Sequence, residues 1–482
     1  MWPKKMDGES LLSSFCSSSK LQSVSMHPAQ PREFVFSRYT LDEVRGEVVF
    51  EYTVRFEERP EERFQDVMSL PKEAQISAIP SALLQRCLQS LHLILGISYW
   101  KMYCPAKICL EAGYGLDAEQ AEFWTTVYTK GLGEFFYRHQ IDFRDLIRFP
   151  VSVDQAEKAI PYTRKNRVLL PIGGGKDSMV SADLLTEAGI PFRPFVYGAS
   201  KVQADVMQFF TEQELSVQTK LDLQMIAPSK SGAAYNGHVP ITTVWSFGAL
   251  FMAVLCDYAW VVFSNEASAS EGNVEYLGLE INHQWSKSIE AEQLIRNYIH
   301  RYVTPDVTLF SLLRPLSELA IAKRFSRSAK RYLGHVSSCN RNFVVSKAQP
   351  ERIGKAYWCG ECPKCAFVFA LLTAFVPKDQ LVDAIGKDLF ADGNLEEVYR
   401  ELLGIKGIKP FECVGTPEET RLAFYLAAKT GSYTSEPIME LFQTEVAPLV
   451  SDWSALEARV LTPNPDTVAL LPKPFQAVYT TL

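Results

Sequence analysis

The chain has 482 residues, which is too long for a single hydrophobic core, so we expect two or three domains. Apolar residues make up 47% of the chain and charged residues 22%, as in ordinary globular proteins, and no apolar run reaches the length of a membrane span. The net charge of −7 excludes a broad basic surface for nucleic acid.

The N-terminal third contains no catalytic motif. Residues 1–30 are rich in serine and lack hydrophobic periodicity, which predicts a disordered segment. From residue 31 to 150, two runs with strand-like alternation (34–36 and 46–56) precede two stretches with helical spacing, 81–95 and 118–140. We therefore expect a separate N-terminal α+β module over 31–150.

A polar stretch, 150–166, links this module to residues 165–335, where predicted strands alternate with predicted helices. An apolar strand at 168–170 leads into three glycines and then a helix. Further strands at 195–198 and 260–263 enclose a helix at 245–255. Alternating strands and helices predict an α/β fold with a doubly wound parallel sheet, whose ligands bind at the carboxyl ends of the strands.

The glycine run belongs to the segment Gly-Gly-Gly-Lys-Asp-Ser, residues 173–178. A glycine-rich turn before a helix favours phosphate, because unpaired backbone amides and the helix dipole both attract anions. The spacing is neither that of a Walker A loop nor that of a dinucleotide-binding loop. The alternative is an ordinary glycine-rich turn between a strand and a helix.

This segment resembles the Ser-Gly-Gly-x-Asp-Ser signature of the PP-loop ATP pyrophosphatases of the HUP-type fold, with Gly173 where that family usually has serine. The family cleaves ATP between the α and β phosphates. The resemblance implies that Asp177 binds Mg²⁺ and that the adenine lies after the second strand. The positions that it assigns to ATP are Gly173, Gly174, Gly175, Lys176, Ser178, Tyr197, Gly198 and Lys323.

Two polar loops, 264–273 and 282–288, follow the predicted strand at 260–263. They contain Glu266, His283 and Lys287, which together are suited to proton transfer. The alternative is that each is an ordinary solvated loop residue. Cys413 is a weaker candidate for the same role: it precedes a helix that opens with a capping box at 416–419, although a buried, inert cysteine is the simpler interpretation.

Four of the ten cysteines form a cluster with metal-ligand spacing: Cys339, Cys359, Cys362 and Cys365. No secretory signal is visible, so we expect a cytoplasmic protein in which these thiols bind metal and form no disulfides. A closed set of four cysteines predicts a structural Zn²⁺, with an iron–sulfur cluster as the alternative. Its spacing resembles the zinc knot of 7-cyano-7-deazaguanine synthase, and helical stretches follow, so we expect a zinc knot and helical region over 336–482.

The glycine turn, both polar loops, the cysteine knot and the segment 409–416 together resemble the MurL-type UDP-N-acetylmuramoyl-L-alanyl-L-glutamate epimerases. This resemblance implies inversion of the terminal L-Glu of the anionic UDP-linked muramoyl dipeptide, for peptidoglycan synthesis. It also implies that ATP and Mg²⁺ drive the reaction through an acyl-adenylate, releasing AMP and pyrophosphate. From the net charge and the lack of a long apolar run, we expect no nucleic acid and no membrane among its partners. The expected catalytic residues are Lys176, Asp177, Glu266, His283 and Lys287.

Two other functions fit parts of the sequence. A ligase resembling 7-cyano-7-deazaguanine synthase would leave the N-terminal module unexplained. A zinc-stabilised sensor that binds ATP without cleaving it would not need Lys176 and Asp177.

Overall fold

The computed structural model describes residues 30–198, 200–343 and 357–480. The segment predicted to be disordered, 1–30, lies outside the described residues except for residue 30. None of the helices in the described ranges has both the length and the apolar character that crossing a bilayer requires.

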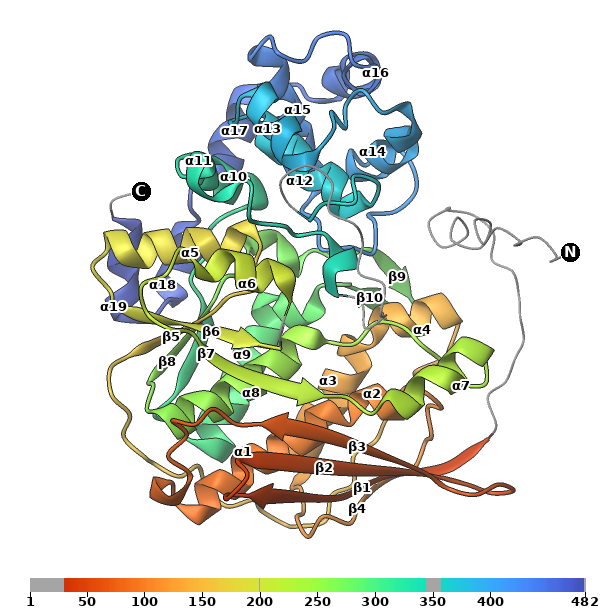
Figure 1. Cartoon of the computed structure of the whole chain (residues 1–482). Coiled ribbons are helices and arrows are strands. Elements are labelled where there is room, and N and C mark those ends of the chain that lie inside the picture. Colours follow the sequence, from red (N-terminus) through yellow and green to blue (C-terminus); the bar gives the residue numbers. More distant parts are fainter. Residues whose placement is uncertain (1–29, 199, 344–356, 481–482) are drawn as a thin grey trace, which may run out of the picture.

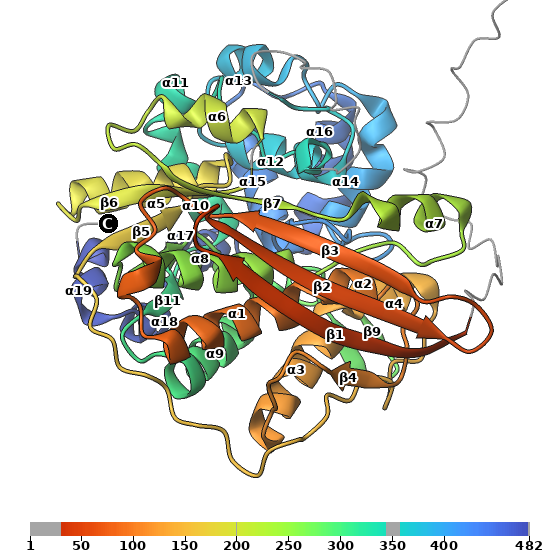
Figure 2. The same ribbon diagram turned by 60° about the horizontal axis from the view of Figure 1, so that its bottom comes forward.

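A nine-stranded mixed sheet forms the centre of the part of the chain that the structure describes (Figures 1 and 2). Five adjacent strands of this sheet run parallel to one another. Three of the five correspond to the strands predicted at 168–170, 195–198 and 260–263. In order across the sheet the strands are β11 (Thr308–Ser311), β8 (Trp260–Phe263), β5 (Val168–Pro171), β6 (Phe192–Tyr197), β7 (Leu215–Lys220), β3 (Glu62–Ser69), β2 (Glu47–Phe56), β1 (Pro31–Asp42) and β4 (Ile108–Leu110).

The glycine turn lies where the order of the parallel strands reverses. The chain proceeds from β5 to β6 and β7 on one side, then returns to place β8 and β11 on the other side of β5. In open α/β sheets a crevice forms at this point, beyond the carboxyl ends of the strands. Both the glycine turn after β5 and the loop after β8 therefore open into the same region.

The N-terminal strands differ from the expectation of a separate module. Strand β3 pairs antiparallel with β7, so β1–β4 extend the same sheet and do not form one of their own. The register joins Val67 to Lys220 and Ser69 to Gln218. The alternation seen in residues 46–56 indicated the strand but not its partner, because pairing is decided between segments far apart in the chain.

The two faces of the parallel strands support two hydrophobic cores. Leu169 and Val261 point into one core, while the neighbouring Leu170 and Val262 point into the other, as strand geometry requires. The first core contains α1 (Ser81–Leu95), α3 (Ala118–Gly131), α8 (Ile241–Cys256) and α9 (Ile289–Tyr298). The second contains α5 (Lys176–Glu187), α10 (Glu318–Ser326), α12 (Pro363–Thr373) and α15 (Pro417–Lys429).

Helices α12 and α15 therefore cover the face that carries α5, and they lie in the upper part of the molecule in Figure 1. Helix α10 packs against α5, α12 and α15 and connects the sheet to them. The capping box predicted at the start of α15 is confirmed, with Thr416 and Glu419 bonding reciprocally. The remaining α-helices are α2 (Ile97–Trp100), α4 (Gly133–His139), α6 (Lys201–Met207), α7 (Ile226–Ser231), α11 (Ala329–Tyr332), α13 (Lys378–Ile385), α14 (Glu396–Leu402), α16 (Pro437–Leu441), α17 (Trp453–Leu461), α18 (Pro465–Leu470) and α19 (Lys473–Gln476).

Candidate functional site

The glycine turn between β5 and α5 is shaped by close backbone packing. Gly174 has φ +87°, and a Cβ there would lie 2.7 Å from a methyl carbon of Val202 and 3.3 Å from the backbone nitrogen of Gln203. A Cβ on Gly175 would lie 2.8 Å from Ser338 Oγ, whereas nothing lies within 4 Å of a Cβ on Gly173. Gly174 is thus required by its positive φ and by backbone packing, Gly175 lies close to a serine side chain, and Gly173 borders open space.

The turn also presents free donors. Among the described residues, none of the backbone hydrogen bonds uses the N–H of Gly173, Gly174 or Gly175. The same three amides precede the N-terminus of the 12-residue helix α5. Free amides, open space at Gly173 and a helix N-terminus fit a phosphate group.

A buried ionic network adjoins the turn. Lys176 contacts both Asp177 and Glu318, and Lys364 Nζ lies 3.1 Å from Glu318 Oε1. Burial would lower the pKa of the Lys176 ammonium, but the two carboxylates raise it above its ordinary value. Asp177 remains half-buried, so its carboxylate has an outer face that is open to a ligand such as Mg²⁺.

Glu419 joins this network to the C-terminal helices and was not predicted as a site residue. Its carboxylate accepts hydrogen bonds from the backbone N–H of Glu318 (2.7 Å), from Ser268 Oγ (3.1 Å) and from the backbone N–H of Thr416 (2.6 Å). Burial raises the pKa of Glu419 to about 7. The capping box was visible in the sequence, but its contact with α10 was not.

Arg314 positions both polar loops. The guanidinium donates to the backbone oxygens of Glu266 (2.5 Å) and Lys287 (2.6 Å), and it pairs with Glu292 at 3.0 Å. Glu266 is buried directly after β8. The two predicted loops therefore meet around one buried arginine.

His283 lies in a cluster that sequence reasoning only partly identified. Its Nδ1 bonds to Glu134 of α4, and its Nε2 lies 3.8 Å from Cys413 Sγ. His238 Nδ1 lies 3.4 Å from the same Glu134 carboxylate. Glu134 and His238 carry no local motif, and only the fold brings them to the loop of residues 282–288.

Lys287 connects this cluster to the ionic network. Burial would lower the pKa of its ammonium, but negative charges on Cys413, Glu266, Asp177 and Glu318 raise it above the ordinary value. Lys287 is thus close enough to interact electrostatically with both the His283–Cys413 cluster and the buried ionic network.

The positions assigned to ATP on the second strand and on α10 have surroundings that differ from those of the glycine turn. The Tyr197 ring packs on α8, where a Cβ at Gly248 would lie 2.2 Å from it, and its hydroxyl accepts a hydrogen bond from Thr219 at 3.0 Å. This is the face opposite α5. Gly198 has φ +88° at the carboxyl end of β6, and Lys323 is exposed on α10. Their roles toward ATP stay predictions.

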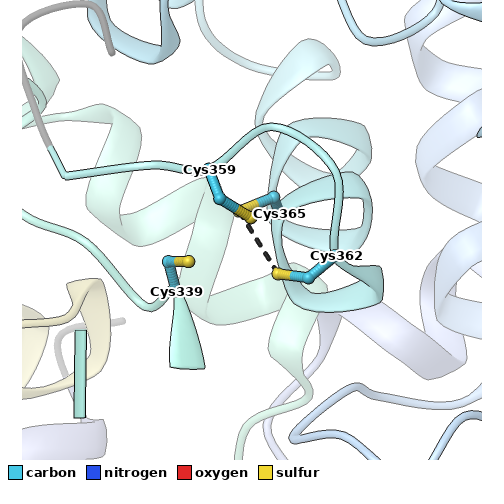
Figure 3. A group of neighbouring side chains, drawn as sticks. All are labelled: Cys339, Cys359, Cys362 and Cys365. Carbon is cyan, nitrogen blue, oxygen red and sulfur yellow. Dashed lines mark hydrogen bonds between the residues drawn. The ribbon is translucent and has the colours of Figure 1, made fainter. Parts of the chain in front are cut away.

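The four clustered cysteines converge as their spacing predicted. Cys365 Sγ lies 3.5 Å from Cys362 Sγ and 3.6 Å from Cys359 Sγ, and all four sulfur atoms, including that of Cys339, lie within 4.8 Å of one another (Figure 3). A tetrahedral Zn²⁺ with ordinary Zn–S bonds separates its sulfur ligands by about 3.8 Å. The arrangement therefore fits a closed four-cysteine zinc site.

Comparison with known families adds independent evidence. The family model described as the MurL N-terminal domain matches residues 25–312, and that of the MurL C-terminal domain matches residues 335–456. The chain belongs to the MurL family. In this MurL chain the first match contains the glycine turn and both polar loops, while the second contains the cysteine cluster and Cys413. The His283–Cys413 contact joins the two.

Named relatives agree with this assignment. Proteins named UDP-N-acetyl-alpha-D-muramoyl-L-alanyl-L-glutamate epimerase are 37% identical in Xanthomonas oryzae, over 86% of this chain and 90% of the relative, and 38% identical in a Micromonospora species, over 89% and 94%. A third, from Salinispora tropica, is 36% identical over 89% and 92%. The predicted MurL resemblance is confirmed, whereas membership of the PP-loop superfamily stays a prediction.

Proposed function

We propose that this protein is a cytoplasmic epimerase that inverts the terminal L-glutamate of UDP-N-acetylmuramoyl-L-alanyl-L-glutamate for peptidoglycan synthesis, with ATP as co-substrate. The names of the relatives support the substrate, and the PP-loop resemblance supports the use of ATP. The observation that carries the proposal is the turn of free amides beside Lys176 and Asp177, at the switch point of the sheet.

The chemistry explains why ATP is needed. The proton on Cα of a free amino acid carboxylate is very weakly acidic, because removing it adds a second negative charge. Transfer of AMP to the α-carboxylate, with release of pyrophosphate, neutralises that carboxylate and provides an electron sink. A side-chain base then removes the proton, an acid on the other face returns one, and hydrolysis of the adenylate releases AMP.

The residues of the turn would serve this reaction in stated ways. The free amides of Gly173, Gly174 and Gly175, with Lys176 and Ser178, would hold the departing pyrophosphate. Asp177 would hold Mg²⁺, which supplies charge neutralisation for the phosphates. The four cysteines would hold a structural Zn²⁺ that fixes the start of α12, and thereby Lys364, against Glu318.

The test is incubation with ATP, Mg²⁺ and UDP-N-acetylmuramoyl-L-Ala-L-Glu in D₂O. We expect deuterium at Cα of the glutamate, D-Glu after hydrolysis, and AMP and pyrophosphate in solution. Asp177→Asn should abolish all of these, whereas Glu187→Gln, at the far end of the same helix, should not. Intact ATP would favour the sensor, and a new amide or nitrile product would favour the deazaguanine-type ligase; either outcome contradicts the proposal.

A further inference from the structure

The loop of residues 282–288 and the segment 412–416 lie directly against each other. Gln284 Nε2 donates to the backbone oxygen of Val414 at 3.0 Å, beside the His283–Cys413 contact. Within the described residues the oxygen of the same side-chain amide, Gln284 Oε1, is buried and has no hydrogen-bond partner. An unpaired buried acceptor costs free energy unless a ligand satisfies it, so this pair of segments is suited to hold a polar substrate.

From the Glu134–His283–Cys413 contacts we propose that Cys413 takes the α-proton of the L-glutamyl residue. Lys287, on the loop that contacts the Cys413 segment, delivers a proton to the opposite face. Glu134 and His283 act as positioning residues for Cys413. The assignment rests on the proposed function and deepens it by naming the proton-transfer pair. It leaves Glu266 outside that pair.

The charges around the thiol favour the base role. Burial would raise the pKa of Cys413, but the Lys287 ammonium and the His283 contact lower it to about 6, with Lys364 adding to the effect. Burial would also lower the pKa of His283, whereas its bonds to Cys413 and Glu134 raise it to about 10. Near pH 7 the pair is therefore a thiolate and an imidazolium.

Other titratable groups surround the same position. The buried carboxyl of Glu412, next in the chain, has its pKa raised to about 7 by burial, and Lys409 contributes a further cation. Burial lowers the pKa of His238 to about 3, so this second histidine is neutral near pH 7. The thiolate thus faces the cations Lys287, His283, Lys364 and Lys409 and the acid Glu412.

Lys287 has the opposite protonation state, which suits an acid. Its pKa is raised, so it enters the reaction as an ammonium, while Cys413 enters as a thiolate. Pairs of groups whose environments drive their pKa values apart are the usual acid and base of an active site. The two come from segments that contact each other, and Lys287 also lies within electrostatic reach of Asp177, where the adenylate would form.

The bonds broken and formed in the proposed proton transfer balance. The Cα–H bond breaks, an S–H bond forms on Cys413, and the electron pair moves into the adenylated carboxyl group. An N–H bond of Lys287 then breaks as the new Cα–H bond forms on the other face. Transfer of the proton from the Cys413 thiol to the Lys287 amine through solvent restores both groups.

The experiment separates adenylation from proton transfer. ATP–pyrophosphate exchange measures adenylation, and deuterium with chiral analysis of the hydrolysed glutamate measures proton transfer. We expect Cys413→Ala to retain exchange within about threefold of the wild type and to lose deuterium incorporation by about a thousandfold or more. Lys287→Met should retain exchange and incorporate deuterium into L-Glu without inversion. Cys109→Ala, a half-buried thiol in the N-terminal region, is the matched control and should behave like the wild type.

The outcomes distinguish the two proposals. If the wild type shows neither exchange nor deuterium, the proposed function is wrong. If the wild type shows both and Cys413→Ala still inverts glutamate, only the Cys413 assignment is wrong. If Lys287→Met loses exchange, or still inverts glutamate, the acid role of Lys287 is wrong.

A readout without substrate tests the positioning residues. We expect iodoacetamide to alkylate Cys413 with a midpoint near pH 6, and we expect His283→Asn and Glu134→Gln to move that midpoint upward by at least one pH unit. Cys109 is the internal control, because burial and Glu33, 3.4 Å away, raise its pKa. An unchanged midpoint in both variants would show that the two residues only support the fold.

Discussion

Glu318 is the centre of the buried ionic network, and replacing it with glutamine tests how that network is held together. Its side chain is 1% exposed and faces two ammonium groups, Lys176 at 2% and Lys364 at 5% exposure. Glutamine keeps the volume and removes the charge. Among the described ion pairs, Lys176 would then keep only Asp177 and Lys364 would lose its carboxylate partner.

The expected cost follows from this burial. Removing one partner of a buried ion pair costs about 3–5 kcal/mol, because the remaining charge stays in a low-dielectric site. Here one carboxylate serves two cations, so we expect Glu318→Gln to lower the free energy of unfolding by an amount near the upper end of that range. The matched control is Glu418→Gln on α15, whose partner Arg459 is 2.9 Å away with both side chains more than half exposed. Such a surface pair contributes about 0–1 kcal/mol.

The assay is urea unfolding, followed by tryptophan fluorescence and far-UV circular dichroism at low and high salt. The effect of Glu318→Gln should persist in 1 M NaCl, whereas the small effect of the control should vanish, because salt screens exposed charges.

The pH dependence has a definite sign. The lysines hold the pKa of the Glu318 carboxyl below its ordinary value of 4.5. Its stabilisation is thus fully present above pH 4.5 and is lost as the pH falls toward the folded-state value. The difference between wild type and Glu318→Gln should hold from pH 8 to 5 and shrink below pH 4. If Glu318→Gln costs no more than the surface control, the reasoning about the buried network is wrong.

Three further predictions concern other parts of the chain. Cys365→Ser should reduce bound zinc from about one ion per chain, measured by atomic emission, and lower the melting temperature by several degrees; unchanged metal content would contradict the four-cysteine site. Gly174→Ala should abolish ATP–pyrophosphate exchange because of its positive φ and its contacts, whereas Gly173→Ser, into open space, should retain it; equal activities would refute the packing argument. Burial raises the pKa of Asp66 to about 7, so the wild type should lose stability as the pH rises from about 4 to 7. Asp66→Asn should remove that loss and be the more stable protein at pH 8 in urea titrations.

Local patterns were enough to predict most individual elements. The alternation in 46–56 and the spacing in 81–95 correspond to β2 and α1, because each pattern reflects which side of one element is buried. The cysteine spacing likewise predicted the cluster, since three of its members lie within seven residues and the fold adds only Cys339. The stretch 118–140 proved to be two helices, α3 and α4, that meet at Leu132.

The sequence by itself determined three of the five parallel strands, the glycine turn, the cysteine cluster and most of the candidate polar residues, because each depends on a local pattern of residues. It did not indicate β7 or β11. Only the tertiary structure decided that β3 joins β7, that Glu419 accepts from the backbone of Glu318, and that Glu134 and His238 gather round His283. Most of these partners are separated by about a hundred residues or more along the chain, and His238 lies 45 positions before His283. Their proximity depends on how the two cores pack against the sheet, and no local periodicity records that packing.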